Sequence, residues 1–308
     1  MKETSTGTRI FLALFRPIQR LPLGFHYFWG SVFSFVTEKV LHYRRDVVIA
    51  NLARSFPSKR YGEIRTLAHA FYVHLGEIFA EAMWFGGNHN RPDRCRKQGI
   101  CRIVNAAELQ EALERSGNVM VLDSHFGNWE LTGGFFQFVY DIPEGGLRIG
   151  EDNIIVVYKR LRSRFWDGFM RENRCAALPP GFQGYTESMN ILRYAFGHRD
   201  EKKIYVFPTD QYPYAGTNSC DVPSFMNQPT KAMVGGAALA RKFGMPVYYM
   251  SMDRIARGKY EVTFKKVCDD ASAFTPGQIM EKYYALLQED VVRNPANYLW
   301  SHRRWKCL

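Results

Sequence analysis

Apolar and polar positions along the chain follow two different periods, which together predict an α/β fold. Over residues 60–85 the apolar side chains recur every three or four residues, which indicates a long helix with one buried face. Short apolar runs at 118–123, 153–158 and 203–208 are typical of buried strands. Further helices are predicted over 44–55, 129–139, 186–197, 231–243 and 276–292, with a hairpin over 246–266. Because helices separate the strands, we expect a mostly parallel sheet flanked by helices.

The N-terminal part of the chain has another pattern. Residues 21–37 contain six aromatic rings and no Asp, Glu, Lys or Arg. A membrane-spanning helix needs about 20 apolar residues, and this segment also contains Gly, Ser, Thr and His. A helix lying in the membrane interface is therefore favoured over a span, and an ordinary core helix is the alternative. Flanking basic residues could meet anionic lipid: Arg16, Arg20, Lys39, Arg44 and Arg45.

The overall charge limits the kind of partner. Lys and Arg exceed Asp and Glu by 41 to 30, a formal net charge of +11, which favours anionic partners such as nucleic acid, phosphate or acidic lipid. No basic helix or RNA-binding aromatic motif is evident, so nucleic acid is not expected. The six cysteines form no C-x-x-C pair, and no dinucleotide fingerprint occurs, so we expect neither a metal nor a cofactor. The N-terminal apolar run is too short for a signal peptide and is expected to stay on the chain.

The stretch VMVLDSHFGNWELTGG, residues 119–134, leads from a predicted strand to His125 and then to Glu130. Ligands of open α/β sheets bind beyond the carboxyl ends of the strands, where His125 falls. A neutral imidazole can take a proton from a hydroxyl, and a nearby carboxylate can fix its tautomer. A structural histidine beside a helix-capping glutamate is the alternative. Ser124 as a nucleophile is a third option, but DSHFG lacks the G-x-S-x-G elbow.

The stretch SHFGNWE resembles the H-x-x-x-x-[D/E] motif of the glycerolipid and lipid A acyltransferase superfamily, and most of the chain resembles the late acyltransferases of lipid A biosynthesis. Four further blocks are similar to that family, in order along the chain: RRDVVIANLARSFPSKRYGEI, TDQYP, PSFMNQPTKAMVGGAALARKFGMPV and NPANYLWSHRRWK. One block departs from it. The family usually has Tyr-Arg-Pro-Leu where this chain has YKRLRSR, so Lys159 stands in place of an arginine. The charge is kept, but the bidentate fork is lost there unless Arg160 or Arg162 supplies it.

The resemblance implies a fold of the glycerolipid acyltransferase type and a membrane-associated O-acyltransferase. The donor is expected to be a thioester, on acyl carrier protein rather than coenzyme A, and the acceptor a hydroxyl of a lipid A precursor. The resemblance implies that His125 is the general base and that Glu130 orients it. Lys159 and Arg162 are expected to stabilise developing charge, with a solvated charged face as the alternative.

Two more pairs are expected to bind substrate. Asp210 and Gln211 follow the predicted strand at 203–208 and are expected to shape the acceptor or phosphate side of the pocket. Arg303 and Arg304 are adjacent, so their side chains diverge. Since tryptophans bracket this pair, we expect a packed segment whose guanidinium groups face a phosphate of the acceptor or an acidic carrier protein. A basic tail in solvent is the alternative.

The resemblance also implies a place in the cell and a division of the chain. We expect a bacterial protein at the cytoplasmic face of the inner membrane, peripheral or monotopic, with acyl carrier protein, a lipid acceptor and the membrane surface as partners. Residues 1–45 are expected to form a membrane-associated helical segment and residues 46–308 the acyltransferase domain. An enzyme acylating a lysophospholipid or an aminoacyl lipid is one alternative, and a non-catalytic peripheral membrane protein is another.

Overall fold

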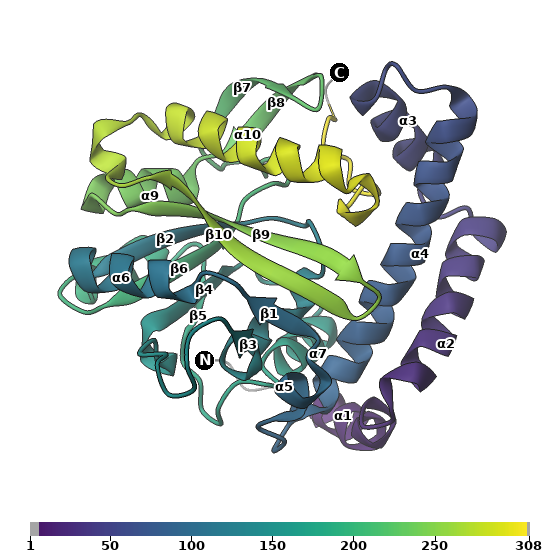
Figure 1. Ribbon diagram of the computed structural model, residues 1–308, viewed down its shortest axis with the longest axis horizontal. Coiled ribbons are helices and arrows are strands. Elements are labelled where there is room, and N and C mark those ends of the chain that lie inside the picture. Colours follow the sequence, from purple (N-terminus) through teal and green to yellow (C-terminus); the bar gives the residue numbers. More distant parts are fainter. Residues whose placement is uncertain (1–5, 307–308) are drawn as a thin grey trace.

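A central eight-stranded sheet organises the structure, a computed structural model in which residues 6–306 are described (Figure 1). The strands are β1 (Cys101–Ile103), β2 (Asn118–Asp123), β3 (Val139–Tyr140), β4 (Ile154–Tyr158), β5 (Tyr185–Glu187), β6 (Lys203–Pro208), β7 (Ser219–Phe225), β8 (Gln228–Met233), β9 (Val247–Ala256) and β10 (Lys259–Cys268). The order in the sheet is β3-β1-β10-β9-β2-β6-β4-β5, while β7 and β8 form a separate hairpin. The β9–β10 pair is antiparallel and the other pairs of the large sheet are parallel. The predicted sheet is confirmed.

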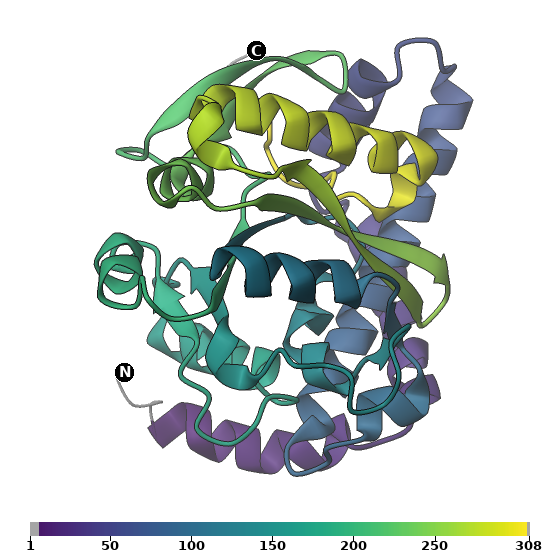
Figure 2. The same ribbon diagram turned by 60° about the vertical axis from the view of Figure 1, so that its left-hand side comes forward.

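Helices surround this sheet. The α-helices are α1 (Thr6–Gln19), α2 (Leu23–Phe35), α3 (Arg45–Ser55), α4 (Tyr61–Phe85), α5 (Arg94–Gln98), α6 (Ala106–Ser116), α7 (Arg164–Arg174), α8 (Ile191–Gly197), α9 (Gly235–Phe243) and α10 (Pro276–Arg293). Short 3-10 segments are η2 (Gly86–Asn88), η3 (Trp129–Gln137), η4 (Glu151–Asn153), η5 (Ala271–Ala273) and η6 (Pro295–Asn297), and η1 (Val36–Val40) is a π-helical turn. Figures 1 and 2 show α9 and α10 on one side of the sheet and α6 on the other.

Strand β2 lies in the middle of the sheet and is covered on both faces. Met120 and Leu122 pack in the core that includes α9 and α10, whereas Val119 and Val121 pack in the second core with α6. All four side chains are buried. Since successive side chains of a strand point to opposite faces, this explains why β2 is apolar without a break. Reactive polar side chains are therefore expected at the ends of such strands and not within them.

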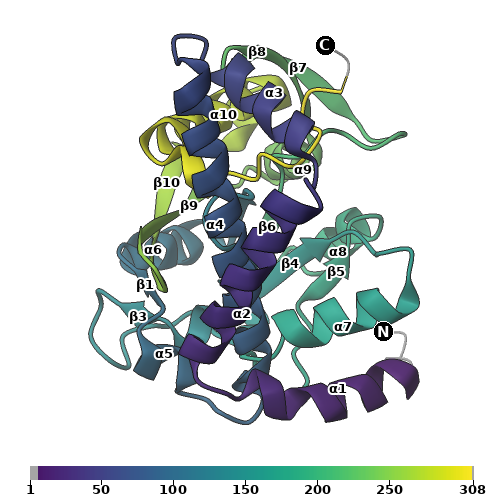
Figure 3. The same cartoon turned by 90° about the vertical axis from the view of Figure 1, so that its right-hand side faces the viewer.

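The N-terminal helices wrap around one side of the domain. Helix α2 lies along α4, and a Cβ built on Gly30 would come within 2.4 Å of the Gly76 carbonyl oxygen, so only glycine permits this approach (Figure 3). Helix α1 lies beside α7 (Figure 3). Large apolar side chains of α1 and α2 nevertheless remain exposed: Ile10, Phe11, Leu14, Ile18, Phe25, Phe28, Trp29, Val32 and Phe35. Within residues 6–306, no helix has both the length and the apolar character needed to cross a bilayer. Interfacial attachment stays a prediction.

Several predicted elements differ from the structure. Residues 129–137 form a 3-10 rather than an α-helix, and the helix predicted over 186–197 begins only at Ile191, because β5 precedes it. The helix predicted over 231–243 begins at Gly235, since the preceding residues pair as β8 with alternating burial. Helices α6 and α7 were not predicted.

Candidate active site

The register of two parallel strands brings His125 and Asp210 together. In the β2–β6 pair Asp123 lies opposite Pro208, so the residues two positions beyond each strand end, His125 and Asp210, emerge side by side. The Nδ1 atom of His125 lies 2.7 Å from Oδ1 of Asp210. The imidazole is 17% exposed and the carboxylate 3% exposed, so the pair is sheltered while the ring still reaches an open space. This is the position where open α/β sheets bind ligands.

The hydrogen bonds of His125 define its tautomer. An ionised Asp210 can only accept, so Nδ1 carries the proton, and Nε2 then accepts from the side-chain amide of Gln211, 3.0 Å away. Burial lowers the pKa of His125, but the charge and hydrogen bond of Asp210, with the charges of Asp123 and Glu130, outweigh it and raise this pKa. Burial raises the pKa of Asp210, yet the charge and hydrogen bond of His125 lower it overall. The imidazole is thus arranged as a base at Nε2.

Glu130, the second residue of the H-x-x-x-x-E motif, has a different partner from the one expected. Its carboxylate accepts two hydrogen bonds from Arg174, from Nε at 2.7 Å and Nη2 at 2.6 Å, and one from Trp129 Nε1 at 3.0 Å. Burial raises the pKa of Glu130, but the Arg174 guanidinium lowers it overall, so the carboxylate stays charged. Within the described residues, no hydrogen bond joins Glu130 to the His125 imidazole, so a direct contact does not support the expectation that Glu130 orients His125. That contact belongs to Asp210, and Glu130 holds Arg174.

Several contacts hold the loop between His125 and Glu130 in place. Gly127 has φ +77°, and a Cβ there would lie 2.1 Å from the Met252 carbonyl oxygen, so the turn requires glycine. The Asn128 side chain is fully buried: its oxygen accepts from the Glu130 backbone N–H, and its amide donates to Glu81 at 2.7 Å. Glu81 also accepts hydrogen bonds from the hydroxyls of Tyr27 and Tyr260. Helix α4 thereby anchors the loop that carries the base.

A mostly apolar cavity of about 130 Å³ opens beside His125. Asp123, Trp129 and Arg174 also line it, and the Trp129 ring lies 4.8 Å from the imidazole, centroid to centroid. Its apolar wall comes from both the sheet and α6: Leu109, Val121, Ile154, Val156, Ile204, Val206, Met250 and Phe264. Burial raises the pKa of Asp123 to about 7. His125 thus lies with Asp123 and Arg174 among the polar residues of an otherwise apolar cavity.

A comparison of the amino-acid sequence with known protein families gives a match over nearly the whole chain. The sequence pattern described as bacterial lipid A biosynthesis acyltransferase matches residues 3–307. The chain belongs to this family. The resemblance on which the sequence-based expectations rested is therefore confirmed, and it covers nearly the whole chain. No curated protein matches the chain at a significant level. The family indicates an acyltransferase, for which a histidine base beside an apolar cavity is suitable.

In this acyltransferase, Lys159 and Arg162 lie apart from the cavity beside His125. Both are exposed, and neither contributes to the wall of that cavity. The Lys159 ammonium lies over the Tyr214 ring, 3.1 Å from its centroid, and the Tyr214 hydroxyl donates to Gln211 at 3.2 Å. Lys159 therefore reaches the base only through two other side chains. Arg174, which sequence reasoning did not assign a role, is the cation that lines the cavity.

Arg303 and Arg304 point in different directions, as their adjacency predicted. Arg303 is exposed, whereas Arg304 is 1% exposed and donates to the Tyr284 hydroxyl at 2.6 Å. The expectation that Arg304 binds a substrate phosphate is not supported, because its guanidinium is enclosed by the fold. Trp300 and Trp305 are buried, so the segment is packed against the domain and is not a tail in solvent.

Two contacts of the site were missed from the sequence. The pairing of His125 with Asp210 could have been inferred from the sequence, because the predicted strands ended at 123 and 208 and each of the two residues follows its strand end by two positions. The Arg174–Glu130 pair could not have been inferred, since α7 was not predicted. Within residues 6–306, no group of three His, Cys, Asp or Glu side chains is close enough to hold a metal ion.

Proposed function

We propose that this family member is a membrane-associated O-acyltransferase that moves a fatty acyl chain from an acyl carrier protein thioester to a hydroxyl of a lipid A precursor. One observation carries the proposal. His125 has Nδ1 bound to Asp210 and Nε2 bound to the side-chain amide of Gln211, and its ring lines an apolar cavity. A base with a fixed tautomer suits the deprotonation of a hydroxyl, and an apolar cavity suits a hydrocarbon chain.

The proposed reaction needs no nucleophile from the protein. The acceptor hydroxyl displaces Gln211 from Nε2 of His125 and gives its proton to the imidazole while its oxygen attacks the thioester carbonyl. A C–O bond forms, the C–S bond breaks, and the imidazolium returns the proton to the departing thiolate. Asp210 stabilises the imidazolium during this cycle, because its carboxylate accepts from Nδ1 throughout. Holding the reactants together supplies much of the remaining rate.

The negative charge that develops on the carbonyl oxygen needs a donor. Arg174 lines the cavity and is held by Glu130 through two hydrogen bonds, so its guanidinium is fixed before substrate arrives. We assign charge stabilisation to Arg174 in place of Lys159 and Arg162. Glu130 is then a positioning residue for that cation.

Membrane attachment is part of the proposal. The apolar side chains exposed on α1 and α2 are suited to the interface, as in helices that lie at headgroup depth. Replacing Phe28 and Trp29 by serine should weaken partition into vesicles, while Val292→Ser, an exposed apolar residue of α10, should not. High salt should release only part of the wild-type protein, because charge and rings both contribute. Complete release by salt would contradict attachment through the rings.

The decisive test of the function is His125→Ala. Transfer from acyl carrier protein to a lipid A precursor should fall by about 10² to 10⁴, the usual contribution of a general base. The folded state should be retained, since the imidazole is partly exposed and the loop is anchored by Asn128 and Glu81. Lipid mass spectrometry of a deletion strain should show the loss of one acyl chain. Near wild-type turnover by the purified variant would refute the assignment.

A further inference from the structure

A strongly basic cavity of about 570 Å³ lies away from His125, between the α1–α2 turn and the segment around α5. Asp93 is the one acidic residue that lines it. Four cations also line it: Arg20, Arg91, Arg94 and Lys97. None of these four cations forms an ion pair within residues 6–306. Unpaired cations facing one space are unusual, because like charges repel and long basic side chains normally spread apart.

Arg94 shows that the cluster is built into the fold. Its Nη1 donates to the Trp84 carbonyl oxygen at 2.9 Å, and its Nη2 donates to the carbonyl oxygens of Gln19 at 3.2 Å and Leu21 at 3.3 Å. Its guanidinium also lies over the Trp84 ring, 4.3 Å from the centroid. Burial, followed by the charge of Arg91, lowers the pKa of Arg94 to about 10. The protein thus fixes a cation among other cations without neutralising it.

The surroundings of this cavity indicate the kind of anion. Ile18, Leu21 and Phe25 are exposed at the α1–α2 turn beside it. Cationic side chains next to exposed apolar side chains fit a molecule with an anionic headgroup and hydrocarbon chains. Arginine and lysine are also the side chains that bind phosphate most strongly.

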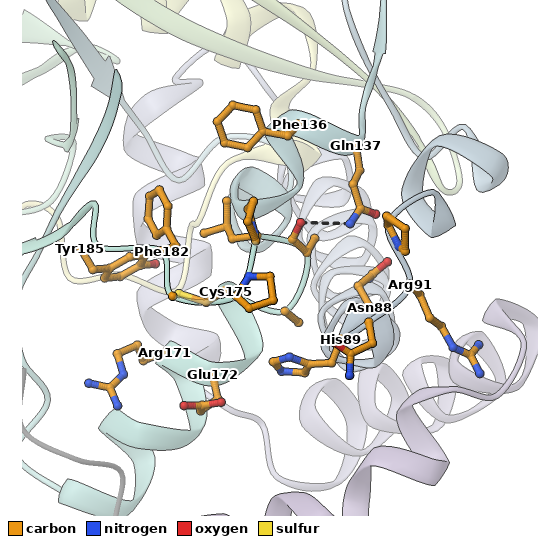
Figure 4. Close-up of a pocket in the computed structure, with 18 of the residues that line it drawn as sticks. Asn88, His89, Arg91, Phe136, Gln137, Arg171, Glu172, Cys175, Phe182 and Tyr185 are labelled. Atoms are coloured by element: carbon orange, nitrogen blue, oxygen red, sulfur yellow. Dashed lines mark hydrogen bonds between the residues drawn. The ribbon is translucent and has the colours of Figure 1, made fainter. Parts of the chain in front are cut away.

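The basic cavity adjoins a larger one. A cavity of about 730 Å³ shares with it Arg91, Pro92 and Asp93 (Figure 4). Figure 4 shows Phe136, Phe182 and Tyr185 on one side of the larger cavity and Asn88 and His89 on another. Tyr185 also lines the apolar cavity beside His125. Each cavity thus shares at least one wall residue with the next, from the α1–α2 turn to His125.

We propose that the basic cavity binds a phosphate group of a membrane lipid, with the rest of the lipid headgroup in the adjoining larger cavity. This assignment rests on the proposed function: the lipid is the phosphorylated acceptor, because the larger cavity shares Tyr185 with the cavity that His125 lines. The phosphate accepts hydrogen bonds from Arg91, Arg94 and Lys97, and the hydrocarbon chains stay with the apolar side chains of the α1–α2 turn.

The kinetic test uses Lys97 and Arg91, because Arg94 also holds the backbone and its replacement could disturb folding. Both side chains are exposed. Lys97→Ala should raise KM for a phosphorylated lipid A precursor about fivefold, the effect of one cation near an anionic headgroup. Lys97→Glu and Arg91→Glu should raise it further. Neither kcat nor KM for the acyl donor should change. Arg241→Glu is the matched control, an exposed residue of α9 at the other end of the molecule (Figure 1).

A phosphatase-treated precursor identifies the recognised group. With this acceptor the Lys97 and Arg91 variants should match the wild type, because the group that they bind has been removed. Equal KM increases for the treated and untreated acceptors would overturn the phosphate assignment. KM changes no larger than those of Arg241→Glu would overturn the whole site, provided that the vesicle measurement below agrees.

Vesicle binding distinguishes the two possible sources of the phosphate group, the acceptor and bulk phospholipid. Phosphatidylcholine vesicles that contain the phosphorylated precursor, the treated precursor or phosphatidylglycerol are compared as binding partners. A loss of binding by Lys97→Glu that is confined to the phosphorylated precursor supports the acceptor. A loss with phosphatidylglycerol and unchanged acceptor KM assigns the site to bulk lipid and overturns the acceptor assignment. Because this measurement needs no turnover, it stands even where the His125→Ala test fails.

Discussion

Two buried carboxylates lie near the loop that carries the base, and they differ in what they hold. Asp210 is 85 residues from His125 in sequence but contacts its imidazole, whereas Glu130, five residues away, contacts Arg174. The strand register explains the first contact, since His125 and Asp210 follow paired strand ends by the same number of residues. The 3-10 segment explains the second, because η3 begins at Trp129 and carries Glu130 away toward α7.

The motif spacing suggested that the Glu130 carboxylate holds His125, but the structure divides the contacts of His125 and Arg174 between two carboxylates. One carboxylate accepts from Nδ1 of His125 and fixes its tautomer, and the other holds the Arg174 guanidinium. Both carboxylates remain ionised, because His125 lowers the pKa of Asp210 and Arg174 lowers the pKa of Glu130, each against the effect of burial. The motif therefore placed His125 and Glu130 near each other, but it did not give the partner of each side chain.

The largest effect is expected from Asp210→Asn. The asparagine amide donates to Nδ1, which forces the proton onto Nε2 and removes the base, so kcat should fall by about 10³ to 10⁴. The side chain keeps its shape, and folding should be retained. Steady-state kinetics and a thermal melt on the same preparation would check both. Asp210→Glu keeps the charge and serves as the control, with a smaller loss of kcat.

If Asp210→Asn retained more than a tenth of wild-type kcat, the proposal that Asp210 fixes the catalytic tautomer of His125 would be wrong.

A second, smaller effect is expected from Glu130. Glu130→Ala should lower kcat by about 10², because Arg174 loses its anchor and the developing oxyanion loses a fixed donor. Glu130→Gln should cost less, since the amide oxygen can still accept from Arg174 and Trp129. The comparison is made at saturating acceptor and donor, so that KM effects do not enter.

The control for Glu130 is the double variant with Arg174→Met. If Glu130 acts through Arg174, the loss in the double variant should be far smaller than the product of the two single losses. Multiplying losses would show that Glu130 acts on the reaction by another route.

Much of the fold could be predicted because its periodicity is local. Strands β2, β4 and β6 are mostly buried, so each reads as an apolar run between polar turns, and α4 has one continuous buried face. Helix α8 could not be separated from β5 in this way, since the boundary depends on pairing of Tyr185 with Val156. The last residues of β8, 231–233, were predicted as helix for the same reason, because β7 supplies the hydrogen bonds of this strand.

The site was predictable only as far as position along a strand determines it. His125 and Asp210 were both identified at strand ends, and knowledge of the strand order would have paired them. The burial of Arg304 could not be predicted, because it depends on Tyr284 of α10, a contact set by the fold. Arg174 was missed because its partner is recognisable only when α7 is placed beside η3.

The pH dependence of activity compares the two carboxylates directly. His125 must be neutral to accept a proton, so activity falls as pH drops through its pKa, which Asp210 holds above the ordinary value. Asp210→Asn removes the largest raising influence, and the acid limb of its residual activity should move down by about one pH unit. Glu130→Gln should move the limb down only slightly, because Glu130 acts on this pKa through charge alone. Equal shifts would contradict the assignment of the contacts.

The smallest expected effect is that of Gln211→Ala, and its sign is opposite. The Gln211 amide donates to Nε2 of His125, which stabilises the neutral imidazole, so removing it should raise the pKa and move the acid limb up by a few tenths of a pH unit. Tyr214→Phe is the matched control, since it keeps the amide and removes only the hydroxyl that donates to Gln211, and its shift should be smaller still. Profiles of kcat/KM against pH, measured in one buffer series for the wild type and both variants, would decide the matter. A downward shift for Gln211→Ala would mean that the amide oxygen faces a protonated Nε2, and the resting tautomer assigned to His125 would then be wrong.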